Sequence, residues 1–452
     1  MTKRRDFIKK TVIGTAGIAI GGKGFSSKSY TSIIGANERI NIAVCGIGGR
    51  GSAHLDNFCA LKDSHNVRLM TICDVDEKFW AEGSRAKIVL DKFGVKPTTE
   101  WDMRKVLDNP DIHAVSFATP NHWHALGSIW ACQASKQVYV EKPVCHNISE
   151  GRKMIEASRK YNVRIQTGFG QTNDEAMKFL HNGGIGEVYM ARGLCIKPRD
   201  SFGIVKDSKP PATLHYDMWL GPAPLRQYNE KRVHYNWNWF WDTGNGDTGN
   251  QGSHQLNAAR VGLNKNEHPV SVYSNGGLYG IDPKECGQET PNTQCSVFKY
   301  SDGKMIVFDT RGRYSNAEGS NNISIGNIFY GTEGYLEYGD GKKSGSWKAF
   351  RKWEKEPFAG TGIGERKIPA EPGANTFANF IDAIRSGNDE DLINPIVGGH
   401  LSTALPLLAN ISYRLGRGLE FNGDTEKFIN DHEADAMLKR IYRDPYGVPD
   451  KV

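Results

Sequence analysis

The fold is decided by one stretch, Ile40-Asn41-Ile42-Ala43-Val44-Cys45, which runs directly into Gly46-Ile47-Gly48-Gly49-Arg50-Gly51. The β-branched run predicts a buried strand, and the glycine-rich turn is followed by a helical stretch. In such a strand-turn-helix unit, glycines allow a pyrophosphate to approach the free N–H groups at the helix N-terminus. The stretch therefore predicts a dinucleotide-binding turn formed by Gly46, Gly48, Gly49, Arg50 and Gly51.

The G-x-G-x-x-G pattern alone has little weight, because 51 of the 452 residues are glycine and the pattern recurs at Gly244, Gly246 and Gly249. The first copy differs because Asp74 closes the next predicted strand, 23 positions after Gly51. A carboxylate there accepts hydrogen bonds from the adenosine ribose and repels a 2′-phosphate. We expect NAD, with NADP disfavoured and Arg50 as the nearby cation that weakens this preference. The alternative is a glycine-rich turn without a ligand.

The chain divides into two predicted domains. Over residues 37–166, strand-like runs at 40–45, 67–73, 114–118 and 137–140 alternate with helix-length segments, which predicts a doubly wound parallel Rossmann sheet. Over residues 167–452, runs at 189–195, 270–273, 295–300, 305–309 and 323–330 are separated by Gly, Asn and Asp turns. They predict an α+β domain with a large, mostly antiparallel sheet. Amphipathic helices are expected at 375–385 and 400–415.

Residues 1–33 are predicted to be a leader and linker. They contain Arg4-Arg5 and an apolar, glycine-rich run at 12–22, which resembles a twin-arginine export signal. The run is shorter than the roughly 20 apolar residues that span a bilayer, so no stable membrane span is expected. We expect the twin-arginine translocase as an export partner and a periplasmic location. The alternative is a basic start of a cytoplasmic protein.

Charge and cysteine content exclude several classes of protein. Lys and Arg number 57 against 51 Asp and Glu, and residues 1–30 hold seven of these cations and one anion, which leaves 50 of each in the rest of the chain. A neutral body gives no electrostatic footprint for nucleic acid or an anionic membrane. The eight cysteines include no C-x-x-C pair, so no structural metal is expected. Cys45 and Cys73 fit strand positions as small apolar residues.

Two further segments follow predicted strands of the first domain. One is Thr119-Pro120-Asn121, with His124 close behind, and the other is Glu141-Lys142-Pro143. In an open parallel sheet the ligand binds beyond the carboxyl ends of the strands, so both segments are expected beside the nicotinamide.

Together with the glycine turn and Gly252-Ser253-His254, these segments resemble the glucose-fructose oxidoreductase, inositol dehydrogenase and rhizopine-catabolism (Gfo/Idh/MocA) family of oxidoreductases. The resemblance covers nearly the whole chain after the leader. It implies that Lys142 is a catalytic lysine and that His254 is its acid/base partner on the second domain. Without the family, Lys142 could be a surface lysine paired with Glu141, and His254 a structural histidine.

The chemistry supports the same pair independently, because removal of hydride from a carbinol carbon requires a group that accepts the hydroxyl proton. Desolvation and a cationic nicotinamide would disfavour the ammonium form of Lys142. The family has an aspartate four residues before the histidine, where this chain has Asn250. An amide can orient the imidazole but does not raise its pKa by charge. Asp247 is a possible substitute.

An aromatic segment at 234–242 precedes this region. Flat rings beside amides and carboxylates match the apolar faces and hydroxyl rims of a sugar, so the segment predicts a substrate wall. The residues chosen for this wall are Tyr235, Trp237, Trp241 and Asp242, with His254 opposite. The alternative is an ordinary core or an oligomer interface.

The sequence thus predicts an exported NAD-dependent oxidoreductase acting on a small-molecule carbohydrate or cyclitol. Since no soluble pool would recycle NADH after export, the cofactor is expected to stay bound and to be regenerated in each turnover. A second candidate is a glycosidase that oxidises the sugar, eliminates the aglycone and reduces the ring again, as in related NAD-dependent α-N-acetylgalactosaminidases. A third is a non-catalytic binding module. An exposed sheet in the second domain makes a homo-oligomer the expected assembly.

Overall fold

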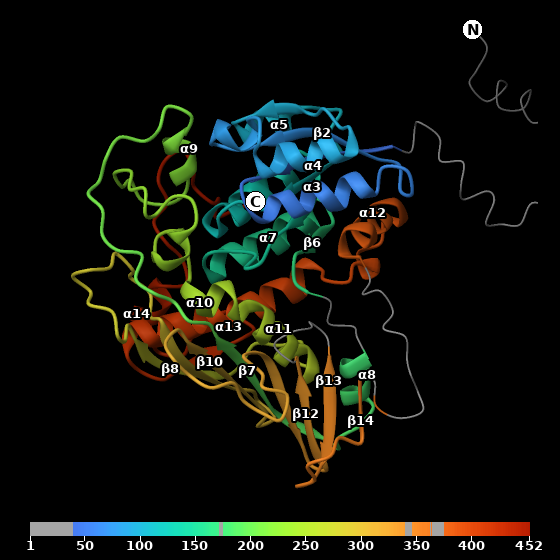
Figure 1. The fold of residues 1–452 in the computed structure, drawn as a ribbon, viewed down its shortest axis with the longest axis vertical. Helices are drawn as coiled ribbons and strands as arrows, with labels where there is room; N and C mark the ends of the chain where they lie inside the picture. Colours follow the sequence, from blue (N-terminus) through green and yellow to red (C-terminus); the bar gives the residue numbers. More distant parts are fainter. Residues whose placement is uncertain (1–38, 171–174, 340–345, 362, 364–374) are drawn as a thin grey trace, which may run out of the picture. The chain divides into compact units, whose positions relative to one another are not determined.

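The structure, a computed structural model, describes residues 39–170, 175–339, 346–361, 363 and 375–452. Two sheets dominate these residues, with helices around and between them (Figure 1). The predicted leader at residues 1–33 lies outside the described residues. In the part of the chain that is described, no helix has the length and apolar character needed to cross a membrane.

The first sheet has six parallel strands in the order β3-β2-β1-β4-β5-β6. Its central strands are almost fully buried, as expected where helices cover both faces. The predicted doubly wound Rossmann sheet is confirmed. The strands are β1 (Ile40–Cys45), β2 (Val67–Cys73), β3 (Thr98–Glu100), β4 (Ala114–Phe117), β5 (Gln137–Val140) and β6 (Ile165–Thr167), and the connecting helices are α3 (Arg50–Ala60), α4 (Arg85–Phe93), α5 (Met103–Asp108), α6 (His124–Gln133) and α7 (Ile148–Tyr161).

The second sheet has ten strands in the order β14-β13-β12-β11-β7-β10-β9-β8-β15-β16. One neighbouring pair, β7 with β10, is parallel, and the others are antiparallel, so the mostly antiparallel sheet is confirmed. The strands are β7 (Val188–Ile196), β8 (Ser271–Gly277), β9 (Thr293–Lys299), β10 (Met305–Arg311), β11 (Ile325–Gly331), β12 (Gly334–Tyr338), β13 (Trp347–Arg351), β14 (Ala359–Gly360), β15 (Leu419–Asn422) and β16 (Lys427–Phe428).

Helix α13 (Ile396–Leu415) lies between the two sheets (Figure 1). It contacts α7 and β6 on one side, and α11 (Gly252–Gly262) and β8 on the other. The predicted helix over 400–415 is confirmed, but it begins four residues earlier and is buried on nearly every side, so its predicted amphipathic character is wrong. A helix enclosed by two sheets needs no polar face.

The chain also returns from the second domain to the first through α12 (Thr376–Ser386). The side chain of Asn375 caps this helix by accepting the N–H groups of Phe377 and Ala378. The ring of Phe377 stacks on that of Tyr139 in β5, with centroids 4.5 Å apart. A helix distant in sequence thus completes the core of the first sheet.

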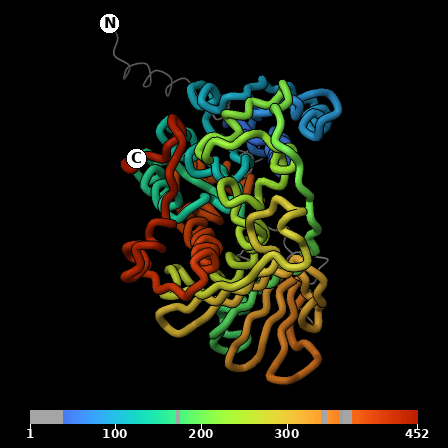
Figure 2. Tube along the Cα trace, turned by 90° about the vertical axis from the view of Figure 1, so that its left-hand side faces the viewer, coloured from blue at the N-terminus to red at the C-terminus, as the bar shows by residue number. Residues whose placement is uncertain are grey.

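A long segment between β7 and α10 (Gly246–Asn250) runs from the second sheet back to the first, and Figures 1 and 2 show it in green. It carries the short helix α9 (Tyr216–Leu220). Backbone hydrogen bonds join it to the residues that follow β2: Glu77 donates to Thr213 (2.9 Å) and His215 donates to Val75 (2.8 Å). The segment therefore forms a wall over the strand ends. Two further helices are α8 (Glu175–His181) and α14 (His432–Ala436).

Candidate functional site

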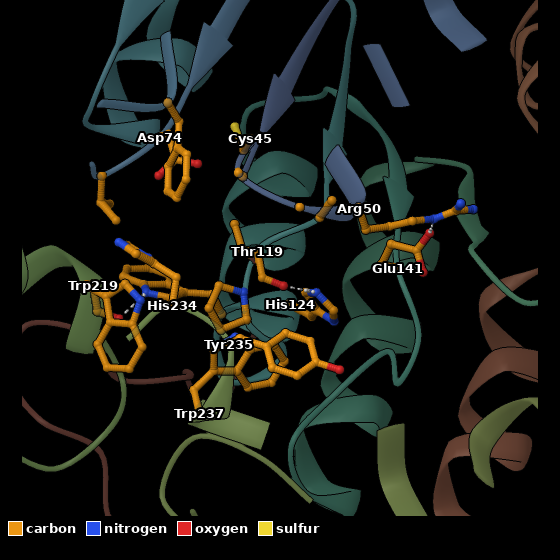
Figure 3. A pocket seen from close by; sticks show the side chains of 18 of the residues that line it. Cys45, Arg50, Asp74, Thr119, His124, Glu141, Trp219, His234, Tyr235 and Trp237 are labelled. Carbon is orange, nitrogen blue, oxygen red and sulfur yellow. Dashed lines mark hydrogen bonds and ion pairs between the residues drawn. The ribbon is translucent and has the colours of Figure 1, made fainter. Parts of the chain in front are cut away.

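A cavity of about 900 Å³ lies at the carboxyl ends of the parallel strands. Its lining includes Gly46 after β1, Asp74 after β2, Thr119 after β4 and Lys142 after β5, while His254 enters from α11 of the second domain. Figure 3 shows Asp74 and Thr119 on one side of this space and Trp219, Tyr235 and Trp237 on the other. The topology thus brings together residues from five separate elements, as expected at the edge of a parallel sheet.

Three glycines of the turn, Gly46, Gly48 and Gly51, leave no room for a side chain. Gly46 has φ +83°, and a Cβ there would lie 2.7 Å from the backbone of Ala118. A Cβ on Gly51 would lie 1.7 Å from the carbonyl oxygen of Gly46, and one on Gly48 would lie 2.6 Å from the ring of Phe79. The turn leads into α3, whose first N–H groups have no partner within the helix. Gly46, Gly48, Gly49 and Arg50 line the cavity, whereas Gly51 packs behind the turn.

Asp74 lies at the end of the cavity formed by β2. Its carboxylate is buried and accepts the N–H groups of Ile47 (2.8 Å) and Asp76 (3.1 Å). Burial raises the pKa of Asp74 to about 6, although these hydrogen bonds oppose the shift. The sequence analysis missed several neighbours that line this end: Lys78, Phe79, Arg85, Trp101 and Met103. Phe79 and Lys78 follow Asp74 closely in the sequence, and that proximity was the available signal.

Arg50 does not face Asp74. Its Nε donates to Oε1 of Glu141 (2.8 Å), and Figure 3 shows the side chain extending away from Asp74. His54, buried in α3, lies with Nε2 3.0 Å from the same oxygen and Nδ1 2.7 Å from the hydroxyl of Ser116. These donors outweigh burial and hold the pKa of Glu141 well below its usual value. Arg50 is therefore committed to Glu141, and the cations that line the Asp74 end of the cavity are Lys78 and Arg85 instead.

Lys142 lies beside Glu141, and its amine is held by the second domain. Nζ donates to the backbone carbonyl of Asn250 (2.7 Å) and lies 3.4 Å from its side-chain oxygen. Burial lowers the pKa of Lys142, and the charge of Glu141 opposes this effect. The prediction that Asn250 orients His254 is not what the geometry shows, because Asn250 ends α10, His254 lies in the separate helix α11, and the hydrogen bonds of Asn250 go to the lysine.

The imidazole of His254 faces the cavity and makes no hydrogen bond to another described residue. Burial, and then the charge of Lys142, lower the pKa of His254 to about 3, so the ring is neutral near pH 7. Asp247, the suggested substitute for a family aspartate, is instead held by Arg199 through two hydrogen bonds of 2.9 Å.

The segment after β4 supplies further lining. Thr119, Pro120 and His124 line the cavity, and the buried hydroxyl of Thr119 has no hydrogen-bond partner among the described residues. The ring nitrogens of His124 lie 2.7 Å from the carbonyl of Pro143 and 2.9 Å from that of Thr119. This histidine therefore joins the segments after β4 and β5. Asn121 is buried next to this segment but is not among the lining residues.

The aromatic segment separates into two groups. Tyr235 and Trp237 line the cavity, together with Asn238 and Trp219, which the sequence analysis did not select (Figure 3). Trp241 and Asp242 are not among the lining residues. Trp241 packs against Tyr413, and the carboxylate of Asp242 pairs with Arg226. The geometry thus supports a substrate contact for Tyr235 and Trp237, and it does not support one for Trp241 and Asp242.

One cluster of possible metal ligands lies away from the cavity lining. The Nε2 atoms of His268 and His400 lie 3.0 and 2.7 Å from Oε1 of Glu426, and Arg152 pairs with the same carboxylate. Two imidazole donors and a guanidinium already compensate this buried charge, so hydrogen bonding accounts for the cluster. All eight cysteines are free, and Cys45 and Cys73 are buried as predicted.

The sequence matches two family models. One, the "Oxidoreductase family, NAD-binding Rossmann fold", matches residues 40–169, and the other, the "Oxidoreductase family, C-terminal alpha/beta domain", matches residues 203–335 and 364–448. Together they account for most of the chain. The chain belongs to the Gfo/Idh/MocA oxidoreductase family. Membership confirms the resemblance found in the sequence and identifies the first domain as an NAD-binding Rossmann domain.

Curated members of the Gfo/Idh/MocA family match part of this chain. Levoglucosan dehydrogenase of Pseudarthrobacter phenanthrenivorans is 30% identical over 166 residues, 34% of this chain and 40% of that protein. The α-N-acetylgalactosaminidase of Shewanella oneidensis is 27% identical over 173 residues, 35% of this chain and 37% of that protein. The matches thus span about two fifths of the relatives' length.

Solved structures of the same family match over a larger share of the chain. Levoglucosan dehydrogenase in complex with NADH and levoglucosan superposes with a TM-score of 0.63 at 18% identity, covering 85% of this chain and 100% of that one. At this identity the likeness establishes the fold.

Proposed function

We propose that this protein is an NAD-dependent oxidoreductase that transfers hydride between a secondary alcohol of a sugar or cyclitol and the nicotinamide. One observation carries the proposal: the amine of Lys142 and the imidazole of His254, from different domains, line the same cavity as the glycine turn. The cavity also suits the nucleotide, since the space around Gly49, the N-cap of α3, is open within 4 Å and the Thr119 hydroxyl lacks a partner among the described residues. Names of relatives that act on levoglucosan and inositol support the substrate class.

The residues of this chain have distinct roles in that reaction. NAD, when bound, would supply the hydride acceptor, and the glycine turn and the first N–H groups of α3 would hold its pyrophosphate. Asp74 would accept hydrogen bonds from the ribose. Lys142, fixed by the carbonyl of Asn250, receives the hydroxyl proton, because burial favours its neutral amine. The neutral imidazole of His254 holds the substrate hydroxyl or relays its proton.

Substrate placement follows from the rings opposite these groups. Tyr235 and Trp237 offer flat apolar surfaces, and the amide of Asn238 and the indole of Trp219 lie in the same wall. A sugar ring presents apolar C–H faces and a polar rim, which matches such a wall.

A panel of sugars and cyclitols tests the proposal. The protein loaded with NAD is expected to form reduced nicotinamide, detected by its absorbance, and a keto product, detected by mass spectrometry. The Lys142→Met variant, which removes the amine and keeps a similar side-chain length, serves as the matched control and should bind NADH but turn over about 10²- to 10⁴-fold more slowly. Turnover by this variant at the wild-type rate would exclude Lys142 as the proton acceptor.

The glycosidase cycle is the second candidate, because an α-N-acetylgalactosaminidase is among the relatives. It predicts release of aglycone from aryl glycosides without net formation of NADH. An oxidoreductase predicts the ketone and no aglycone, so the same incubation separates the two activities.

We also propose that the protein is exported with its cofactor bound. The leader with Arg4 and Arg5 motivates export, and tight cofactor binding would remove the need for an external supply. Mass spectrometry of ligand released from protein purified without added nucleotide tests retention. Fractionation of cells that express the wild-type chain or its Arg4→Lys/Arg5→Lys variant tests export, and equal periplasmic amounts would contradict it.

A further inference from the structure

We propose that residues 213–234 form a strap that retains the nucleotide in the cavity, with His234 as the latch on the first domain. This inference rests on the proposed NAD chemistry. The strap belongs to the second domain by sequence, yet its ends cross the mouth of the cavity where Asp74 lies. Retention by such a strap would give the bound cofactor the long residence that repeated turnover requires.

The inner side of the strap is bonded directly to the residues after β2. Nε2 of His234 lies 2.8 Å from Oδ2 of the buried Asp76, and its ring packs edge-on against Phe79 at 4.9 Å. His215 stacks on Trp101 with centroids 4.0 Å apart and an interplanar angle of 8°. His234, Phe79 and Trp101 all line the cavity, so these contacts close its adenosine end.

Backbone contacts support the same closure. A β-bridge joins Asp76 to Leu214, and the two interdomain hydrogen bonds described above flank it. Side-chain and backbone contacts thus connect the ends of the strap to Trp101 and to residues 75–79, which follow Asp74. Its middle is also attached to the first domain, because Nε1 of Trp123 donates to the carbonyls of Met218 (3.0 Å) and Trp219 (3.2 Å). Release of a nucleotide bound beside Asp74 requires these contacts to open together.

The outer side of the strap is held by the C-terminal tail. The guanidinium of Arg443 donates to the carbonyl of Gly221 (3.1 Å) and to that of Asp217 (2.7 Å). The hydroxyl of Tyr446 donates to the carboxylate of Asp217 (3.1 Å). Neither tail residue lines the cavity. Tyr446 also packs against Trp123 of the cavity lining, whereas the hydrogen bonds of Arg443 go only to the strap. Substitution of Arg443 therefore separates strap closure from direct cofactor contact.

The test measures NADH dissociation from the full-length protein. The chain is loaded with NADH and mixed with a large excess of NAD, and the loss of bound NADH fluorescence gives the dissociation rate. His234→Ala and Arg443→Ala should each release NADH at least tenfold faster than the wild type. Leu225→Ala, an exposed position of the same strap, is the matched control and should stay within twofold. Circular dichroism tests whether each variant is folded. If Arg443→Ala is not folded, Arg443→Lys replaces it.

The outcomes are distinguishable. Wild-type rates in both His234→Ala and Arg443→Ala overturn the strap while leaving the NAD chemistry intact. Faster release in His234→Ala with no change in Arg443→Ala also overturns it, because His234 would then act by touching the nucleotide itself. A wild-type protein that fails to bind NADH overturns the proposed function.

Discussion

Substitution of Gly51 by alanine should abolish tight nucleotide binding. The new Cβ would lie 1.7 Å from the carbonyl oxygen of Gly46, whereas ordinary van der Waals contact begins at 3.4 Å. The backbones of Gly46 and Gly51 must therefore move apart by about half that contact distance. Gly46 has little freedom to move, because its N–H donates to the carbonyl of Cys73 (2.8 Å) and a Cβ built on it would already lie 2.7 Å from the backbone of Ala118. The strain must therefore displace the turn relative to α3.

Overpacking of a tight site costs about 1–3 kcal/mol of stability. Displacement of the turn also removes aligned N–H donors from the pyrophosphate, and a hundredfold weaker affinity for NADH corresponds to about 2.7 kcal/mol. We expect at least that loss in a fluorescence titration of Gly51→Ala, with a lower midpoint in urea denaturation.

Gly49→Ala is the control within the same turn, because a Cβ there meets no atom within 4 Å. Because Gly49 is the N-cap of α3, the Gly49→Ala protein should be about 1 kcal/mol less stable and should bind NADH with little loss of affinity. If the dissociation constants of Gly51→Ala and Gly49→Ala for NADH differed by less than threefold, the glycine turn would not hold the pyrophosphate.

The remaining predictions concern the ionisable groups of the site. Lys142→Met should lower kcat by about 10²- to 10⁴-fold in steady-state assays while the dissociation constant for NADH stays near wild type, because general base catalysis contributes that much. Asn250→Asp would place a carboxylate where the amide oxygen lies 3.4 Å from Nζ of Lys142. This change should raise the lysine pKa and move the acid limb of the kcat/KM profile for alcohol oxidation up by about 1–3 pH units; an unmoved limb would argue against Lys142 as the base. Burial raises the pKa of Asp74 to about 6, so NADH affinity should be constant above that pH and fall by up to tenfold per unit below it, as titrations across the range would show. His54→Ala removes a donor from the buried carboxylate of Glu141 and should cost about 2–4 kcal/mol in chemical denaturation, whereas His65→Ala, at a partly exposed surface position, should cost little.

Local sequence determined the first domain and the principal site residues. The strand at residues 40–45, its glycine turn and Asp74 form a short pattern in which each residue type has a backbone or charge requirement. Lys142 could be placed beside them without coordinates, because all carboxyl ends of a parallel sheet meet at one edge. Five of the ten strands of the second sheet, β7 to β11, were also predicted from composition and turns, whereas β12 to β16 and the strand order were not.

Tertiary structure alone decided which partner each side chain takes. Asn250 was expected to serve His254, but a break between α10 and α11 presents its carbonyl to Lys142 instead. Arg50 pairs with Glu141, and Trp241 and Asp242 do not line the cavity although Tyr235 and Trp237 of the same segment do. The strap and the burial of α13 likewise depend on segments far apart in the chain. Sequence periodicity reports which face of a helix or strand is buried, but it does not report which distant segment lies against that face. These contacts depend on how the two sheets pack against the helices they share.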